Sequence, residues 1–247
     1  MEFTPYVILV LAISFWWSGL VRAGLGFGGA GLMYPVALLA VDSIVFLVPI
    51  ICVQLMIFSS VTLAREYRKI DWRVLTILLA AILPTFMLGV LGLVSFPEWV
   101  LLAAVYTVII SYSIFYIFNF HTRSKGNWWV DGSILLLGGY VSGLSLAGAP
   151  IIAAVGLRLL DRNQLRATLF VLWFLLCAIK LSTLAYYQVD LQLRHQLWLL
   201  PCALVGHLIG MRLHERILHM QSPVFYRGMG SVLLSLCLLS LANQLLY

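Results

Sequence analysis

Two segments of the 247-residue chain combine glycine with polar groups in a pattern suited to binding a small ligand. The first covers residues 22–31 and reads RAGLGFGGAG; the second covers residues 142–150 and reads SGLSLAGAP. Glycine inside a helix costs about 1 kcal/mol relative to alanine, so clustered glycines indicate that a helix stops. We therefore predict that both segments are helix breaks, where main-chain groups are open to a ligand.

A new helix is expected after each break, and Pro150 fits the first turn of such a helix because proline lacks the N–H that is unpaired there. A helix N-terminus carries free N–H groups and a partial positive charge, which attract anions. The predicted substrate-binding residues of the breaks are Gly24, Gly26, Phe27, Gly28 and Gly29 in the first, and Gly143, Ser145, Ala147, Gly148 and Pro150 in the second. Glycines three or four residues apart also allow close helix packing, and both roles can coexist.

Four polar side chains lie in or beside the apolar runs. Arg22 is a candidate partner for a substrate anion, or a cytoplasmic anchor if the first apolar segment spans the membrane. Lys180 either pairs with the anion or extends along its own stem to the interface. His207 is a candidate for carrying a coupling proton, or for a hydrogen bond to a neighbouring helix. Gln54 is a weaker candidate of the same kind. The expected spans contain no mid-span Asp or Glu, which favours an anion over a cation.

The amino-acid composition indicates that these residues lie in a membrane protein. Hydrophobic residues make up 63% of the chain and charged residues 10%, against about 25% charged in soluble domains. We predict an all-α polytopic membrane protein with ten apolar segments, of which the second, sixth and seventh are short. These cover residues 5–21, 28–40, 44–64, 74–94, 98–119, 133–145, 149–160, 165–187, 195–211 and 229–246. The four cysteines lie inside these runs and are expected to be packing residues, with substrate contact as the alternative.

The positions of the lysines and arginines predict the orientation of the chain in the membrane. All except Lys180 and Arg194 fall at alternate connections between segments, and the positive-inside rule makes those connections cytoplasmic. Both termini are then extracytoplasmic. The sidedness of the other loops is unchanged if segments one and two, and likewise six and seven, are re-entrant pairs. This placement explains most of the net charge of +6 without nucleic acid as a partner.

The two halves of the chain align at a constant offset of 119 residues. Since each half holds an odd number of segments, five, the second half enters the membrane from the opposite face. We therefore expect a first repeat over 1–120, a cytoplasmic linker over 121–132 and an inverted repeat over 133–247. The matched pairs are Gly19 and Gly138, Gly24 and Gly143, Gly29 and Gly148, Asp42 and Asp161, Tyr67 and Tyr186, and Asp71 and Asp190; after a slip of two, Pro84 and Gly89 match Pro201 and Gly206.

The sequence resembles the sulfite exporter TauE/SafE family of membrane permeases. The resemblance covers most of the chain and rests on GLGFGGAGLMYP at 24–35, its degenerate copy GLSLAGAPI at 143–151, and the repeated tyrosine-to-aspartate loops. It implies transport of sulfite, sulfonates or related small sulfur anions. Ser145 and Ala147 stand where the first copy has Gly26 and Gly28, so the two breaks need not contact the ligand equally.

We expect a transporter that binds a small sulfur anion at a midplane site between the repeats and works by alternating access. The alternatives are a carrier for a cation or neutral metabolite, and a membrane scaffold without transport. No enzymatic activity, cofactor or metal is expected. The expected location is a bacterial-type plasma membrane, where the lipid bilayer, a coupling proton and other copies of the chain are the possible partners.

Overall fold

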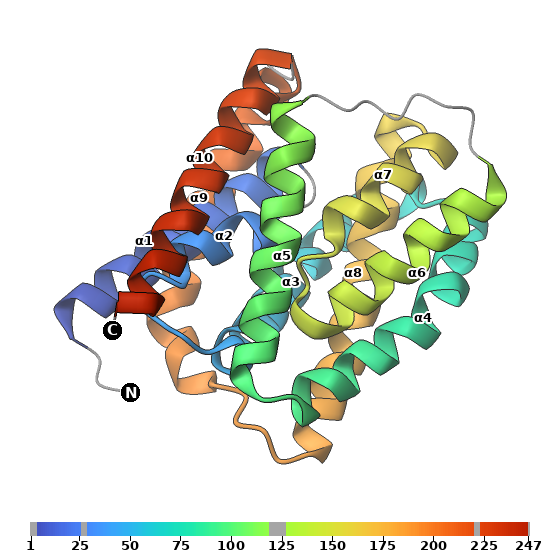
Figure 1. The fold of residues 1–247 in the computed structure, drawn as a ribbon. Coiled ribbons are helices and arrows are strands. Elements are labelled where there is room, and N and C mark those ends of the chain that lie inside the picture. Colours follow the sequence, from blue (N-terminus) through green and yellow to red (C-terminus); the bar gives the residue numbers. More distant parts are fainter. Residues whose placement is uncertain (1–3, 26–28, 119–126, 220–222, 247) are drawn as a thin grey trace. The chain divides into compact units, whose positions relative to one another are not determined.

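The computed structural model describes residues 4–25, 29–118, 127–219 and 223–246. These ranges contain ten α-helices and one short 3-10 helix, and no strand (Figure 1). The ten predicted segments are thus confirmed as helices. Their bounds are α1 Pro5–Leu25, α2 Gly29–Ala37, α3 Ile44–Glu66, η1 Tyr67–Lys69, α4 Trp72–Ser95, α5 Glu98–Ile117, α6 Trp128–Ser145, α7 Ala149–Leu159, α8 Arg162–Tyr186, α9 Leu193–His219 and α10 Pro223–Leu246.

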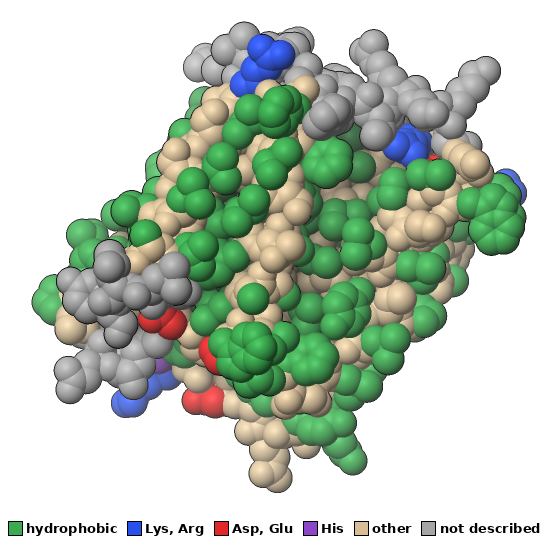
Figure 2. All heavy atoms as spheres, in the orientation of Figure 1, with side chains coloured by type: hydrophobic (Ala, Val, Ile, Leu, Met, Phe, Trp, Pro, Cys, Tyr) green, Lys and Arg blue, Asp and Glu red, His purple; other side chains and the backbone are tan. Residues whose placement is uncertain are grey.

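Six of these helices, α1, α3, α4, α5, α8 and α9, contain windows long and apolar enough to cross a bilayer, among the residues described. Exposed hydrophobic side chains cover the visible helix faces, and charged side chains lie toward the helix ends (Figure 2). Trp72, Trp99 and Trp128 stand at helix starts and are largely exposed, as expected for an interfacial aromatic belt.

Three helices were expected to be short, and the structure corrects one of them. Helix α6 begins at Trp128 instead of residue 133, because Asn127 caps its N-terminus by accepting a hydrogen bond from the Trp129 N–H. Helices α2 and α7 have 9 and 11 residues. At 1.5 Å per residue they extend about 14 and 17 Å, roughly half of a 30 Å hydrocarbon core.

The chain forms two compact units, and each takes helices from both halves of the sequence. Unit 1 comprises residues 1–43, 98–124 and 197–247; unit 2 comprises residues 44–97 and 125–196.

In unit 1, α2 folds back along α1 to form a hairpin. The start of α2 lies against the last turns of α1, because a Cβ added at Gly29 would lie 2.9 Å from the Arg22 Cβ and from the Ser18 carbonyl oxygen. At the other end of the hairpin, the Tyr6 hydroxyl donates to the Leu39 carbonyl at 3.4 Å. The two ends of the hairpin are therefore tied together.

The rest of unit 1 packs around this hairpin. Helix α9 approaches α1 at glycine: a Cβ added at Gly206 would lie 2.9 Å from the Trp16 carbonyl carbon and 3.0 Å from the Leu20 nitrogen. Helices α5 and α10 pack together and share a buried hydrogen bond of 2.8 Å between the Tyr106 and Ser240 hydroxyls. Close backbone approach at small residues is typical of membrane helices.

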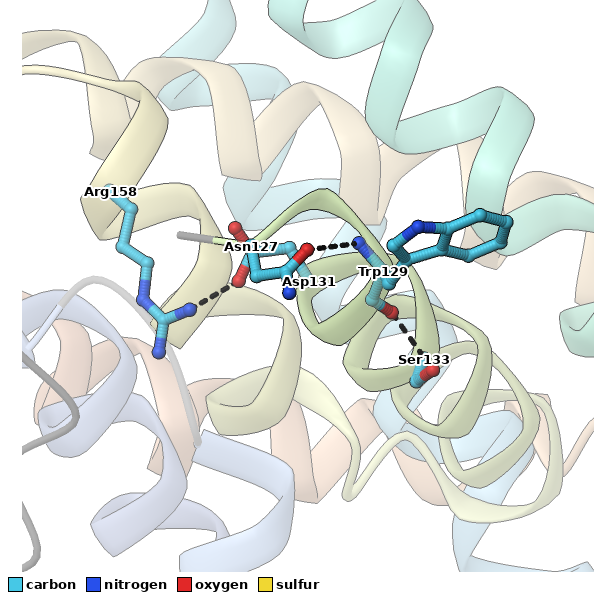
Figure 3. A network of polar contacts seen from close by, with 5 residues as sticks. All are labelled: Asn127, Trp129, Asp131, Ser133 and Arg158. Atoms are coloured by element: carbon cyan, nitrogen blue, oxygen red, sulfur yellow. Dashed lines mark hydrogen bonds and ion pairs between the residues drawn. The ribbon is translucent and has the colours of Figure 1, made fainter. Parts of the chain in front are cut away.

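Unit 2 contains a second hairpin, α6–α7. Its open end is closed by an ion pair in which Arg158, in the last turn of α7, donates to Asp131, in the first turn of α6 (Figure 3). Nearer the break, a Cβ added at Gly138 would lie 2.8 Å from Ile152. The short helix thus returns along the long one, as in the α1–α2 hairpin.

Two further pairings complete unit 2. Helix α4 packs tightly on α6, since a Cβ added at Gly143 would lie 2.8 Å from the Gly89 Cα atom. Helix α3 packs along α8. Asp71 caps α4 by accepting from the Val74 N–H, and its own N–H donates to the Thr168 hydroxyl of α8.

Candidate functional site

The second break is fully described and consists of a turn between α6 and α7. Helix α6 ends where Leu146 adopts a left-handed conformation with φ of 62°, and the Leu146 N–H donates to the Ser142 carbonyl at 3.0 Å. This is the left-handed cap that usually employs glycine. The Ser145 hydroxyl donates to the Val141 carbonyl and accepts from the Ala147 N–H. The Ser145 hydroxyl thus stabilises the turn between α6 and α7 through two hydrogen bonds.

Helix α7 begins directly after this turn. Gly148 is its N-cap residue and Pro150 lies in its first turn, which confirms the predicted helix start. The space around Gly148 accepts no side chain: an added Cβ would collide with the Gly138 carbonyl oxygen and the Ser142 hydroxyl, and would lie 2.8 Å from the Ser142 nitrogen. Glycine is therefore required for the N-terminus of α7 to lie beside the last turns of α6.

Lys180 of α8 reaches this break. Its side chain is fully buried, and its ammonium donates to the Ser142 carbonyl at 2.7 Å. The ammonium also lies 5.4 Å from the centre of the Phe86 ring, within cation–π range. Lys180 therefore does not reach a membrane surface along its stem. Its charge stabilises the C-terminal end of α6, where the helix dipole is negative.

No carboxylate pairs with Lys180 among the residues that the structure describes. Its other electrostatic neighbours include the buried thiols of Cys52 and Cys177. A buried ammonium without a counter-ion is costly, because burial removes its hydration and a single carbonyl replaces little of it. The site therefore has unbalanced positive charge.

Ser142 is a polar residue of this site that is not among the binding residues predicted from the sequence. Its side chain is fully buried, and its hydroxyl oxygen has no hydrogen-bond partner in the described part of the chain. It lies against Gly148, at the start of α7. The signal was available in the sequence, because Ser142 is the first residue of the second glycine segment.

The second break thus gathers three kinds of hydrogen-bond donor. These are the Lys180 ammonium, the Ser142 hydroxyl and the main-chain N–H groups of Gly148 and Ala149; Pro150 has no N–H, and the Ile151 N–H donates to the Gly148 carbonyl. All three suit oxygen atoms that carry negative charge. Gly143 is placed differently: its described role is close packing of α6 against α4. A substrate contact at Gly143 stays a prediction.

The first break is described only in part. Gly26, Phe27 and Gly28 lie outside the described residues. Arg22 is buried in the last turn of α1, and its Cβ faces Gly29 at the start of α2. Gly24 lies in the same last turn. Within unit 1, Arg22 and Gly29 thus lie together, where the last turn of α1 meets the start of α2.

The two secondary candidates are buried in different units. His207 of α9 lies in unit 1, and its backbone nitrogen would be 3.0 Å from a Cβ added at Gly19 of α1. Gln54 of α3 lies in unit 2, and its amide nitrogen has no hydrogen-bond partner among the described residues. Neither observation tests the predicted role in coupling or binding.

Within the described residues, ten helices, six of them with a membrane-length apolar window, are those of an integral membrane protein of the polytopic helical class. The family model "Sulfite exporter TauE/SafE" matches residues 10–240, so the chain belongs to this transporter family. The comparisons with curated proteins and with solved structures gave no match.

Proposed function

We propose that the protein transports a small sulfur oxyanion, such as sulfite or an organosulfonate, and that the α6–α7 break binds it. The proposal rests on the position of Lys180. Its ammonium is fully buried at the break and has no paired carboxylate among the described residues. An oxyanion beside it would supply the missing counter-charge. The family supports the same substrate class.

In this proposal, the anion lies at the N-terminus of α7. Its oxygens accept from the Ser142 hydroxyl and from the main-chain N–H groups near Gly148, and Lys180 supplies the full positive charge. The Ser142 carbonyl also accepts from the Leu146 N–H, so it keeps one hydrogen bond when the ammonium turns to the substrate. Binding therefore need not unravel the end of α6.

The equivalent break in unit 1 is proposed to contribute in the same way, with Arg22 as its cation. One position in each closing contact agrees with the proposed repeat, since Leu39 and Arg158 are related by the offset of 119 residues, whereas their partners Tyr6 and Asp131 are not. Each hairpin has both ends tied together, which suggests that it enters and leaves the membrane on one side. In this proposal, the positive-inside rule has the α1–α2 hairpin enter from the extracytoplasmic side and the α6–α7 hairpin from the cytoplasmic side.

Alternating access between such inverted repeats is the transport mechanism that we propose. Each short helix is about half as long as a bilayer core is thick, so a helix that ends at the membrane surface would begin, at the break, at membrane depth. His207 and Gln54 remain candidates for proton coupling and for the pathway, respectively.

A thermal-stability scan with small sulfur anions tests the binding proposal. Sulfite, methanesulfonate and taurine are added to the purified protein, with chloride at equal ionic strength as the control. A ligand at 100 times its Kd stabilises the folded state by about 2.7 kcal/mol, and roughly 2–4 °C of Tm accompanies each kcal/mol. The expected result is a saturable rise for at least one sulfur anion. No rise with any of them would contradict the proposed site.

A further inference from the structure

Unit 1 contains an apolar cavity of about 530 Å³ that is separate from either break. It lies between α1, α2 and α10, and its lining includes Trp16, Trp17, Leu32, Val36 and Gly228. This volume is in the range of small-molecule pockets, roughly 300–1,000 Å³.

The exposure of the lining shows where the cavity opens. Leu32 is 4% exposed and forms the inner wall, whereas Ile13 and Val232 are 48% and 58% exposed at the rim. From this rim the exposed apolar surface continues along α1 to Leu9 and along α10 to Leu239. In an integral membrane protein such a surface borders lipid hydrocarbon, so the cavity opens toward the hydrocarbon core of the bilayer.

The side chains of the lining indicate which kind of ligand the cavity can bind. Among the lining residues that the structure describes, none is charged, and the indole N–H groups of Trp16 and Trp17 are the polar side-chain groups. An anion or a lipid headgroup would find no counter-charge there. A hydrocarbon chain gains dispersion contacts with the aromatic and aliphatic walls.

We propose that this cavity binds an acyl chain of a membrane phospholipid. The chain enters between Ile13 and Val232 and packs against Leu32 and Val36 of α2. Since α2 is only 9 residues long, the bound lipid extends the apolar contacts that hold this helix against α1 and α10. The site is independent of the proposed anion site in unit 2.

A substitution at Gly228, a glycine of the lining, can be used to fill the cavity. Gly228 is part of the lining and a Cβ added there meets no atom within 4 Å, so Gly228→Leu is expected to occupy part of the cavity. Gly132 of α6 is the matched control, because an added Cβ there also meets open space and Gly132 is not in the cavity lining. Val36→Phe fills the cavity from α2 and serves if Gly228→Leu does not yield monodisperse protein.

The experiment titrates phosphatidylcholine with dibrominated acyl chains into delipidated protein in detergent and records tryptophan fluorescence. Wild type and Gly132→Leu are expected to show a quenching component that saturates at one lipid per chain. Gly228→Leu should lose this component, and Trp16→Phe should reduce its amplitude. Equal saturable quenching in Gly228→Leu, or quenching that only rises without saturation in wild type, would overturn the proposal and leave general surface lipid as the explanation.

Discussion

Replacing Lys180 with methionine should weaken anion binding strongly and leave the fold intact. Methionine keeps much of the side-chain length and removes the ammonium that donates to the Ser142 carbonyl. A hydrogen bond to a charged group is worth about 1.5–3 kcal/mol, which corresponds to an affinity loss of about 10- to 150-fold. The fold should survive, because the Ser142 carbonyl still accepts from the Leu146 N–H and a buried charge is removed.

Thermal unfolding with and without sulfite measures both effects. At a sulfite concentration 100 times the wild-type Kd, the stabilisation should fall from about 2.7 kcal/mol to about 0.3–1.4 kcal/mol. Lys69→Met is the matched control, since Lys69 lies exposed in η1 and should leave sulfite affinity unchanged. Unaltered affinity in Lys180→Met would refute the assignment of the ammonium to the anion. A large loss of ligand-free stability would show that Lys180 is mainly structural.

Further substitutions test separately the Ser142 hydroxyl, the start of α7 at Gly148 and the ion pair of the α6–α7 hairpin. Ser142→Ala should lower anion affinity by about 2- to 10-fold, the worth of a neutral hydrogen bond, without loss of ligand-free stability, since the hydroxyl has no partner among the described residues; equilibrium binding measures it. Gly148→Val should abolish transport, because its side chain collides with the last turns of α6; uptake into proteoliposomes measures it. Asp131→Asn and Arg158→Gln should show a coupling free energy of about 0.5–1 kcal/mol in a double-mutant cycle of unfolding, because the pair is only partly buried.

Each of these variants has its own contrary outcome. Full transport in Gly148→Val would remove the α7 N-terminus from the substrate site. A loss of stability in Ser142→Ala equal to its loss of affinity would make the hydroxyl a structural group. Additive effects in the Asp131 and Arg158 cycle would mean that the ion pair does not hold the α6–α7 hairpin closed.

Hydrophobicity and glycine placement were sufficient to predict the ten helices, because each membrane helix needs a long apolar run and each break interrupts one. The apolar run predicts a start at residue 133, five residues later than the observed start of α6 at Trp128. The side-chain cap at Asn127 extends the helix into that region. Element ends depend on such local hydrogen bonds, which hydropathy does not report.

The candidate site was predicted only in part, for a different reason. Lys180 and the break at Gly148 were singled out separately, one as a charge in an apolar run and the other as an interrupted helix. That the ammonium reaches the Ser142 carbonyl depends on how α8 packs against α6, which no local pattern specifies. The same limit applies to Gly143, which packs on Gly89 although its sequence context resembles that of a ligand contact.

Efflux of radiolabelled sulfite from proteoliposomes measures whether the protein transports a small sulfur oxyanion and whether Lys180 takes part. Vesicles are loaded with labelled sulfite, and efflux is compared for wild type, Lys180→Met and protein-free vesicles. We expect saturable efflux with wild type that methanesulfonate inhibits, and a higher half-saturation concentration with Lys180→Met. Efflux from wild-type vesicles at the protein-free rate, in either direction of an imposed proton gradient, would contradict the proposed transport.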